Sequence, residues 1–430
     1  MQLNLPYESF TLDNGLQLLV HEDRTTPIVA VNLWYRVGSK DERPGRTGFA
    51  HLFEHLMFEG SAHAAKGAFD ELLEAAGGYN NGSTTTDRTN YYETVPTSAL
   101  ELALWLEADR MGWLLPAMTQ EKLDGQRDVV KNERRQSYEN RPYGLAYETI
   151  LAALYPPDHP YHWPVIGSME DLDAASLEDV ERFFRTYYAP NNASLAIAGA
   201  VDAATVRRMV ERYFGDIPGG ADVPHVAAAS GSIPEDRALV LEDDVELPRL
   251  YMAWHSPAFF DEGDAALDFV ASVLADGKPS RLHRSLIYER RIAQDVQAFQ
   301  NSGMLGSSFF VVVTGRQGIS LAELEQGVRR ELEAIVTRGI EERELERVRN
   351  QIETDFVDGL QNVLNRADRL NLYAYYTGDP GYVGEDLERY RRLRSADVVD
   401  AARRYLLEAP SVVLSVVPKG RRDLAAREAA

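Results

Sequence analysis

The sequence of 430 residues contains no cysteine, no long apolar run and fewer basic than acidic residues. The absence of cysteine excludes disulfides and thiolate ligands, so a metal site in this chain has to use histidine and carboxylate side chains. Because no apolar run reaches about 18 residues, we expect no transmembrane helix. The N-terminal segment also lacks the basic region and apolar run of a signal peptide. We therefore expect a cytoplasmic protein, or a periplasmic one if a leader has been removed.

Acidic residues outnumber basic residues by 67 to 45, which gives a net charge of −22. A surface of this sign repels phosphate backbones, so we expect no nucleic-acid partner. The ordinary interpretation of the charge is solubility. A more specific interpretation is an acidic chamber that attracts basic peptides, and the sequence leaves both open.

A stretch rich in proline, glycine, alanine and serine lies at the middle of the chain. It covers residues 216–235 (DIPGGADVPHVAAASGSIPE) and has the composition of a linker. We therefore predict an N-terminal domain over residues 1–215 and a C-terminal domain over residues 236–430. A chain of this length fits two domains of ordinary size.

The two halves show a similar order of patterns and are predicted to be distant repeats. In each half an alternating apolar stretch leads through a polar turn into a helical segment that ends near a glycine, Gly60 or Gly277. Aligning these glycines places residues 51–55 over residues 268–272, where the apolar positions match but the histidines and the glutamate do not. We expect only the first half to hold a metal.

Secondary-structure signals favour an α+β fold for each half, with a mixed or antiparallel sheet covered by helices. Strand-like stretches lie at Glu8–Val20, Val29–Val37, Thr84–Val95, Ala193–Ala198, Ala238–Leu241, Leu250–His255, Ser307–Thr314 and Ser411–Val417. Helical stretches lie at Thr47–Phe58, Ala68–Ala76, Ala99–Met111, Gln120–Tyr138, Ser176–Tyr188, Ala203–Tyr213, Ala265–Leu274, Leu321–Val336 and Glu341–Gly359. Strands and helices do not alternate strictly, which argues against a parallel α/β sheet.

The helical stretch Thr47–Phe58 contains candidate metal ligands and a candidate catalytic base. His51 and His55 are four residues apart, so a helix places their imidazoles on one face, where they can bind one metal ion. Glu54 lies near the same face and can reach a metal-bound water as a general base. This H-x-x-E-H order is an inversion of the commoner zinc-peptidase motif. The alternative is a helix whose two histidines are merely packed or solvated.

Two histidines do not complete a hydrolytic zinc site, which usually has three protein ligands. The helical stretch from Thr119 to Tyr138 offers Glu133, and Val129 and Val130 give this stretch an apolar face. In isolation, Glu133 beside Arg134 would be interpreted as a surface ion-pair residue.

Several motifs together resemble the pitrilysin/insulinase-type zinc peptidases, and most closely the half-size bacterial members related to mitochondrial processing peptidase. The motifs are GFAHLFEHLMFEG at 48–60, GGYNNGST at 77–84 with DRT at 87–89, RDVVKNER at 127–134, VIGS at 165–168 and YAPNN at 188–192. They cover the first half densely and the second half weakly.

The resemblance implies one Zn²⁺ per chain, with His51, His55 and Glu133 as its ligands and Glu54 as the general base. It also implies that an edge strand around Asn81, Gly82 and Ser83 pairs with an extended peptide substrate. Backbone pairing of this kind gives affinity with little sequence preference. The family fold is a pair of α+β domains per half-size subunit, with two subunits closing around a chamber.

Two positions depart from the family pattern. Where the family often has a glutamate seven residues before the distal ligand, this chain has Gln126, which keeps hydrogen bonding but loses the charge behind the ligands. Where the family's second domain has an arginine and a tyrosine that hold the substrate, this chain has Tyr288 and Gln294. A one-residue gap in that alignment brings Arg290 or Arg291 into consideration.

If the arginine–tyrosine pair is absent, a partner must supply it. We therefore expect a heterodimer with a related, zinc-free chain rather than a homodimer. The predicted function is a zinc-dependent endopeptidase for peptides or unfolded segments. The alternatives are a non-catalytic subunit of a related peptidase complex and a metal-binding protein without hydrolytic activity.

Overall fold

The computed structural model describes residues 3–224, 226 and 231–428. Residues 225 and 227–230 of the predicted linker lie outside the described residues. By its contacts the chain divides into two compact units, which we name the N-terminal unit and the C-terminal unit. The N-terminal unit comprises Met1–Glu133, Pro164–Val226 and Asp355–Asp386, and the C-terminal unit comprises Arg134–Trp163, Ala227–Thr354 and Leu387–Ala430.

Each unit therefore contains one segment from the other half of the sequence. Residues 134–163 precede the predicted linker but pack in the C-terminal unit, and residues 355–386 follow it but pack in the N-terminal unit. The division into residues 1–215 and 236–430 did not include this exchange. Linker composition predicts where two domains are joined along the sequence, but it does not show which sheet a distant helix covers.

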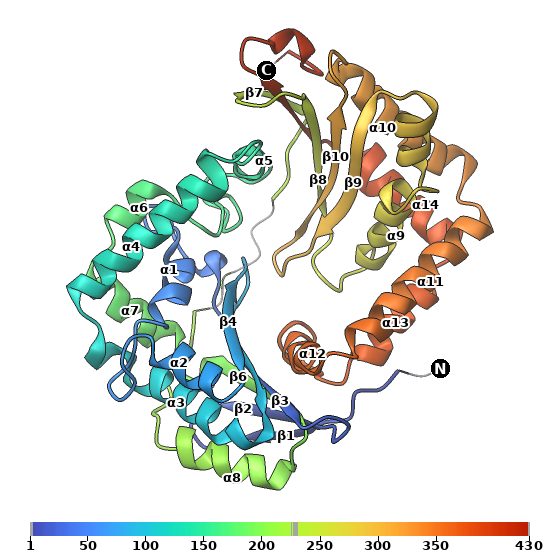
Figure 1. Cartoon of the computed structure of the whole chain (residues 1–430). Helices are drawn as coiled ribbons and strands as arrows, with labels where there is room; N and C mark the ends of the chain where they lie inside the picture. The colour runs from blue at the N-terminus through green and yellow to red at the C-terminus, as the bar shows by residue number, and fades with distance from the viewer. Residues whose placement is uncertain (1–2, 225, 227–230, 429–430) are drawn as a thin grey trace. The chain divides into compact units, whose positions relative to one another are not determined.

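The N-terminal unit contains a six-stranded sheet in the order β1-β2-β6-β3-β5-β4 (Figure 1). Only β2 and β6 run parallel, and every other neighbouring pair is antiparallel. The strands are β1 (Glu8–Thr11), β2 (Gln17–Glu22), β3 (Ile28–Tyr35), β4 (Tyr79–Thr84), β5 (Thr89–Pro96) and β6 (Ala193–Gly199). Strands β3 and β6 are buried along almost their whole length because helices cover both faces of the sheet.

Two predicted strands are in fact interrupted. The stretch Glu8–Val20 forms β1 and β2 around a turn at Asp13-Asn14-Gly15, and Thr84–Val95 contains the end of β4, a turn and most of β5. Both turns are polar, and Asn14-Gly15 in the first is a recognised hairpin signal, so the two predicted strands were wrong to continue through them.

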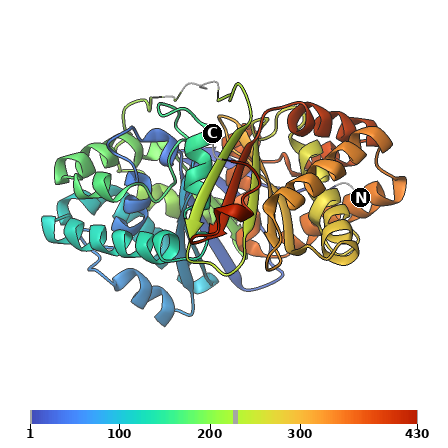
Figure 2. The same ribbon diagram turned by 90° about the horizontal axis from the view of Figure 1, so that it is seen from above.

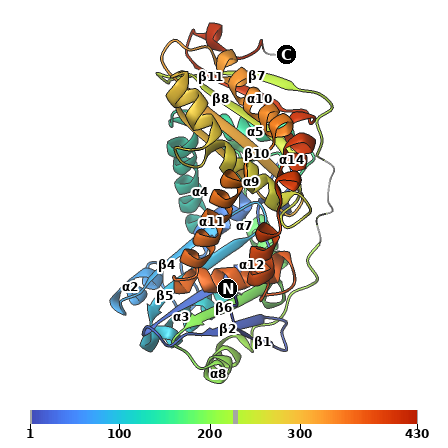
Figure 3. The ribbon, with the colours of Figure 1, turned by 90° about the vertical axis from the view of Figure 1, so that its right-hand side faces the viewer.

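Helices from separate parts of the chain cover this sheet. Helix α3 contacts β3 and β5, helix α12 contacts β3 and β6, and α8 packs beside β2 at the end of the sheet where β1 lies (Figure 3). The helices of this unit are α1 (Phe49–Leu56), α2 (Ala68–Ala75), α3 (Leu100–Ala117), α4 (Gln120–Arg134), α6 (Met169–Asp173), α7 (Leu177–Tyr187), α8 (Ala203–Phe214) and α12 (Val363–Tyr376).

Polar contacts as well as apolar packing attach α12 to the sheet. The Asp368 carboxylate accepts hydrogen bonds from Asn32 Nδ2 at 3.0 Å and from Trp34 Nε1 at 3.1 Å. Asn371, which is fully buried, donates to the backbone carbonyl of Asn32 at 2.8 Å. These contacts provide hydrogen-bond partners for polar groups of β3 that burial would otherwise leave unsatisfied. They therefore favour the packing of α12 on this face of the sheet.

The C-terminal unit contains a five-stranded sheet in the order β7-β11-β8-β10-β9, in which only β7 and β11 are parallel (Figure 2, yellow-green and dark red). Its strands are β7 (Arg237–Asp243), β8 (Arg249–Ser256), β9 (Ala293–Asn301), β10 (Ser307–Gly315) and β11 (Val412–Pro418). Its helical segments are α5 (Ala146–Leu154), α9 (Asp264–Ala275), α10 (Leu321–Arg338) and α14 (Ser395–Ala402), together with most of α11 (Glu342–Gly359) and the second part of α13 (Val383–Arg391). Ile150 and Leu154 of α5 share a buried cluster with Tyr251 and Phe310 of the sheet.

The two sheets have the same topology once β1 is set aside. Replacing β2 to β6 by β7 to β11 in chain order converts one strand order into the other, including the single parallel pair. The predicted class, two related α+β domains with mostly antiparallel sheets, is confirmed. Within the described residues, no helix has the length and apolar character that a membrane crossing requires.

Candidate metal centre

Helix α1 carries the H-x-x-E-H motif and is fixed at its N-terminus by an acidic residue. Phe49, Leu52 and Phe53 are buried, so the helix has one packed face. The oxygens of Glu42 accept hydrogen bonds from the Gly48 and Ala50 N–H groups at 2.9 and 2.8 Å. These N–H groups have no partner inside the helix, and a negative charge is favourable at this end of the helix dipole.

Gly48 itself has a φ of 85°, and a Cβ atom there would lie 2.7 Å from the carbonyl oxygen of Ile166. Only glycine fits such a position without strain. The helix therefore begins two residues later than the predicted stretch Thr47–Phe58, and its start is set by this tight approach.

His51 and His55 lie side by side on α1, with ring centroids 4.9 Å apart. Glu133, near the C-terminus of α4, faces them. Its Oε2 atom is 3.8 Å from His51 Nε2 and 3.4 Å from His55 Nε2. One ligand atom from each of the three residues lies within 4.8 Å of the others, and no other such group of three potential ligands occurs in the described part of the chain.

These distances suit zinc. Bonds of about 2.0–2.2 Å at tetrahedral angles place two ligand atoms about 3.4 Å apart. The side chains are 12, 24 and 39% exposed for His51, His55 and Glu133, so the cluster is accessible from one side. Two histidines and a carboxylate form a donor set that zinc commonly takes in hydrolytic sites.

The directions of the pKa shifts of His51 and Glu133 also favour metal binding. Burial lowers the pKa of His51, and the hydrogen bond from His55 lowers the pKa of Glu133. A neutral His51 and an ionised Glu133 are forms that bind a metal, and the proton that His55 donates to Glu133 would leave when the metal binds.

Glu54 is not a member of the cluster of three and has a hydrogen-bond partner of its own. Its Oε2 accepts a hydrogen bond from Thr84 Oγ1 at 2.6 Å. Thr84 is the last residue of β4, so the edge strand orients the carboxylate expected to act as base. Sequence reasoning identified neither Thr84 nor Glu42, since both contacts depend on how α1 packs against its neighbours.

The residues expected to bind substrate, Asn81, Gly82 and Ser83, all lie on β4. This strand pairs with β5 on one side and is the last strand of its sheet, so it has a free edge within the described chain. A Cβ atom at Gly82 would lie 3.2 Å from Glu54 Cγ, which shows how closely the strand passes the carboxylate. A free edge next to Glu54 is suited to pairing with an extended peptide.

Gln126, on α4, contacts the segment that follows α1. Its Nε2 donates to Glu59 Oε1 at 2.5 Å, and Glu59, just beyond α1, also pairs with Lys66 at 2.7 Å. Glu59 is only 3% exposed. The amide thus partners a buried carboxylate, and a carboxylate at position 126 would face a like charge.

We expect Gln126→Glu to lower the free energy of unfolding by about 1–3 kcal/mol, because it exchanges a hydrogen bond for two opposed carboxylates. Urea unfolding at neutral pH measures the change. The swapped double variant Glu59→Gln/Gln126→Glu restores one donor and one acceptor and should recover most of the loss. Equal stability of all three proteins would show that the contact is unimportant.

The four residues singled out in the second half lie in the C-terminal unit. Tyr288 lies in the short helical segment His283–Glu289 and is 52% exposed, and Gln294 is an exposed residue of β9. Arg290 is 3.8 Å from Glu323, and Arg291 has a φ of 55°.

Two family models match consecutive parts of the chain. Residues 17–159 match the family model described as insulinase (peptidase family M16), and residues 174–352 match the one described as peptidase M16 inactive domain. The first match includes His51, Glu54, His55 and Glu133.

Relatives and solved structures cover nearly the whole chain. The zinc protease PqqE of Helicobacter pylori is 30% identical over 96% of this chain and 93% of its own length. An uncharacterized zinc protease of Mycobacterium leprae is 29% identical over 86% of this chain and 83% of its own length. A crystal structure of a protease from Helicobacter pylori superposes with a TM-score of 0.90 at 28% identity, covering 97% of this chain and all of that one. A structure titled peptidase M16 inactive domain, from Pseudomonas fluorescens, has a TM-score of 0.86 at 19% identity over 96% of this chain and 98% of that one, and shows a shared fold.

Proposed function

The chain belongs to peptidase family M16, the insulinase family, and on this premise we propose that it is a zinc-dependent endopeptidase acting on peptides or unfolded segments. The observation that carries the proposal is the convergence of His51, His55 and Glu133, with a separate carboxylate, Glu54, beside them. Relatives of this chain are named zinc proteases, in agreement with the proposal.

In the proposed mechanism, His51, His55 and Glu133 hold one zinc ion, which when bound lowers the pKa of a water and polarises a carbonyl. Glu54 accepts a proton from the water that attacks the peptide carbonyl carbon, and then gives this proton to the amine nitrogen as the C–N bond breaks. Thr84 orients the Glu54 carboxylate through its hydroxyl group. The β4 residues Asn81, Gly82 and Ser83 bind the substrate backbone as an added strand.

Hydrolysis of a quenched fluorescent peptide tests the proposal. We expect cleavage by the zinc-loaded protein, loss of cleavage after treatment with a chelator, and recovery on adding one equivalent of zinc. A protein that retains zinc but does not cleave, alone or with a partner chain, would favour the metal-binding alternative.

We also propose that the working form is a heterodimer with a related, zinc-free chain. The support is the presence of Tyr288 and Gln294 where family members have a substrate-holding arginine and tyrosine. Size-exclusion chromatography with light scattering on the protein expressed alone measures its state. A stable and fully active homodimer would refute this proposal without affecting the zinc site.

The contact between Thr84 and Glu54 gives a prediction of its own. Thr84→Val keeps the branched shape that a strand favours but removes the hydroxyl donor. We expect kcat to fall about 10- to 150-fold, since a hydrogen bond to a charged group contributes about 1.5–3 kcal/mol, while KM and zinc content change little. Thr84→Ser keeps the donor and should retain most of kcat. Equal losses in both variants would point to packing rather than to the hydrogen bond.

A further inference from the structure

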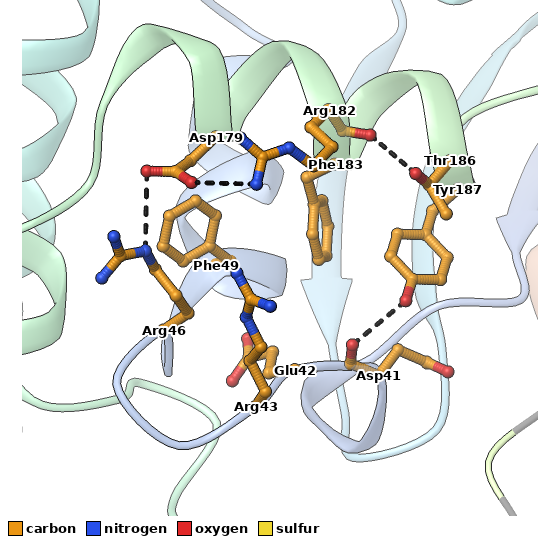
Figure 4. Close-up of a pocket in the computed structure, with 10 residues that line it drawn as sticks. All are labelled: Asp41, Glu42, Arg43, Arg46, Phe49, Asp179, Arg182, Phe183, Thr186 and Tyr187. Carbon is orange, nitrogen blue, oxygen red and sulfur yellow. Dashed lines mark hydrogen bonds and ion pairs between the residues drawn. The ribbon is translucent and has the colours of Figure 1, made fainter. Parts of the chain in front are cut away.

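A pocket of about 230 Å³ lies in the N-terminal unit between α7 and the segment that leads into α1 (Figure 4). Phe49, the first residue of α1, lines it. Because successive helical residues turn by about 100°, Phe49 points away from the side of α1 that carries His51. The pocket is therefore separate from the metal centre, although it lies against the same helix.

The pocket combines aromatic rings with guanidinium groups. Its aromatic lining residues are Phe49, Phe183 and Tyr187, and its basic ones are Arg43, Arg46 and Arg182. In Figure 4 the Arg43 side chain points toward the rings of Phe49 and Phe183. Rings beside guanidinium groups favour a ligand that has both an apolar part and a negative charge.

The acidic residues of the lining are already engaged with neighbours. The contacts are Asp41 with Lys40 Nζ and the Gly38 N–H, Glu42 with the N–H groups of Gly48 and Ala50, and Asp179 with the N–H and hydroxyl of Ser176. In Asp41 and Asp179 both bonds fall on the Oδ2 atom, and Asp179 is also the carboxylate that lies nearest to Arg46 and Arg182.

Each of the three guanidinium groups, in contrast, has N–H donors that make no hydrogen bond within the described residues. Arg43 is exposed, and its side chain makes no hydrogen bond or ion pair within the described residues. Arg46 forms an ion pair with Asp179, with Nε 3.5 Å from Oδ2, and its Nη1 atom donates to the carbonyl of Gly45 at 2.7 Å, whereas the buried Nε atom makes no hydrogen bond. Arg182 forms ion pairs with Glu178 at 3.0 Å, outside the pocket lining, and with Asp179 at 3.7 Å.

We propose that this pocket binds a small carboxylate that bears an aromatic or branched apolar group. Arg43 and Arg46 donate to the carboxylate, and Phe49 and Phe183 contact the apolar group. The volume is below the ~300–1,000 Å³ of pockets for drug-sized ligands, so the ligand is about the size of one residue. Both the C-terminal residue of a peptide and a free aromatic acid have this chemistry. The inference goes beyond the proposed peptidase activity and does not depend on it.

Calorimetric titration with N-acetylphenylalanine tests the proposal, with its C-terminal amide as the uncharged ligand. Both zinc-loaded and chelator-treated proteins are titrated, since a carboxylate can also bind zinc. We expect similar binding to both forms, at least tenfold weaker binding of the amide, and at least tenfold weaker binding of the acid to Arg43→Gln. Arg208→Gln, at an exposed arginine of α8, is the matched control and should bind the acid normally. Circular dichroism checks that Arg43→Gln is folded.

Several results would overturn the proposal. These are no heat of binding at millimolar acid, equal affinity for acid and amide, unchanged affinity in Arg43→Gln, and binding that disappears with the zinc. If the acid binds as expected, titration with a hexapeptide that ends in phenylalanine distinguishes the two sources of the ligand. If it binds as well as N-acetylphenylalanine, the pocket accepts a peptide C-terminus, and if only the single residue binds, it accepts a free acid.

Discussion

Replacing Glu54 with glutamine is expected to reduce peptide hydrolysis by about 10²–10⁴-fold while the protein still binds one zinc per chain. Glutamine has the same shape as glutamate but cannot take up the proton that the proposed mechanism transfers. Its amide oxygen can still accept the hydrogen bond from Thr84, which Glu54 accepts at 2.6 Å, so the position of the side chain should be kept. Zinc should remain because the three clustered ligand atoms come from other residues.

Metal analysis and a continuous fluorescent-peptide assay, run on the same preparations, measure both effects. Glu74→Gln, at an exposed glutamate of α2, removes the same charge from the same unit and should leave both zinc and activity unchanged. If Glu54→Gln cleaved at the parent rate, Glu54 would not be the base. If it lost zinc, Glu54 would contribute to holding the metal.

Sequence periodicity predicted the helix that carries the H-x-x-E-H motif better than it predicted the contacts around that helix. Four-residue spacing correctly placed His51 and His55 on one helical face, because helical geometry is local. Glu133 is 78 positions after His55, and spacing alone could not predict that it lies beside the two histidines. It was chosen from an apolar face on its helix and from family resemblance, and it lies 3.4 Å from His55 Nε2.

Contacts that depend on tertiary packing were not predictable in this way. Thr84 was expected to begin a strand, but it ends β4, and its contact with Glu54 exists only because β4 passes beside α1. Helices α5 and α12 lie in the two exchanged segments and were not among the predicted helices. Their packing is decided by contacts such as that of Asp368 with Asn32, which join residues 336 positions apart.

Replacing Glu133 with glutamine should weaken zinc binding, whereas Glu54→Gln should leave it intact. It removes the anionic member of the cluster, so we expect zinc affinity to fall by more than about 100-fold, since even groups behind a ligand contribute 10–100-fold. Activity at limiting zinc should fall in parallel. Added zinc should also raise the melting temperature much less than it does in the parent, because stabilisation by a ligand follows its affinity for the folded state.

Competition with a fluorescent zinc chelator measures the affinity, and differential scanning fluorimetry measures the stabilisation. Glu121→Gln is the matched control, because it removes an exposed carboxylate from the same helix, α4. Parent-like zinc affinity in Glu133→Gln would mean that the third ligand lies elsewhere. Loss of zinc in this variant, together with retained zinc and lost turnover in Glu54→Gln, would separate the residue that holds the metal from the residue that moves the proton.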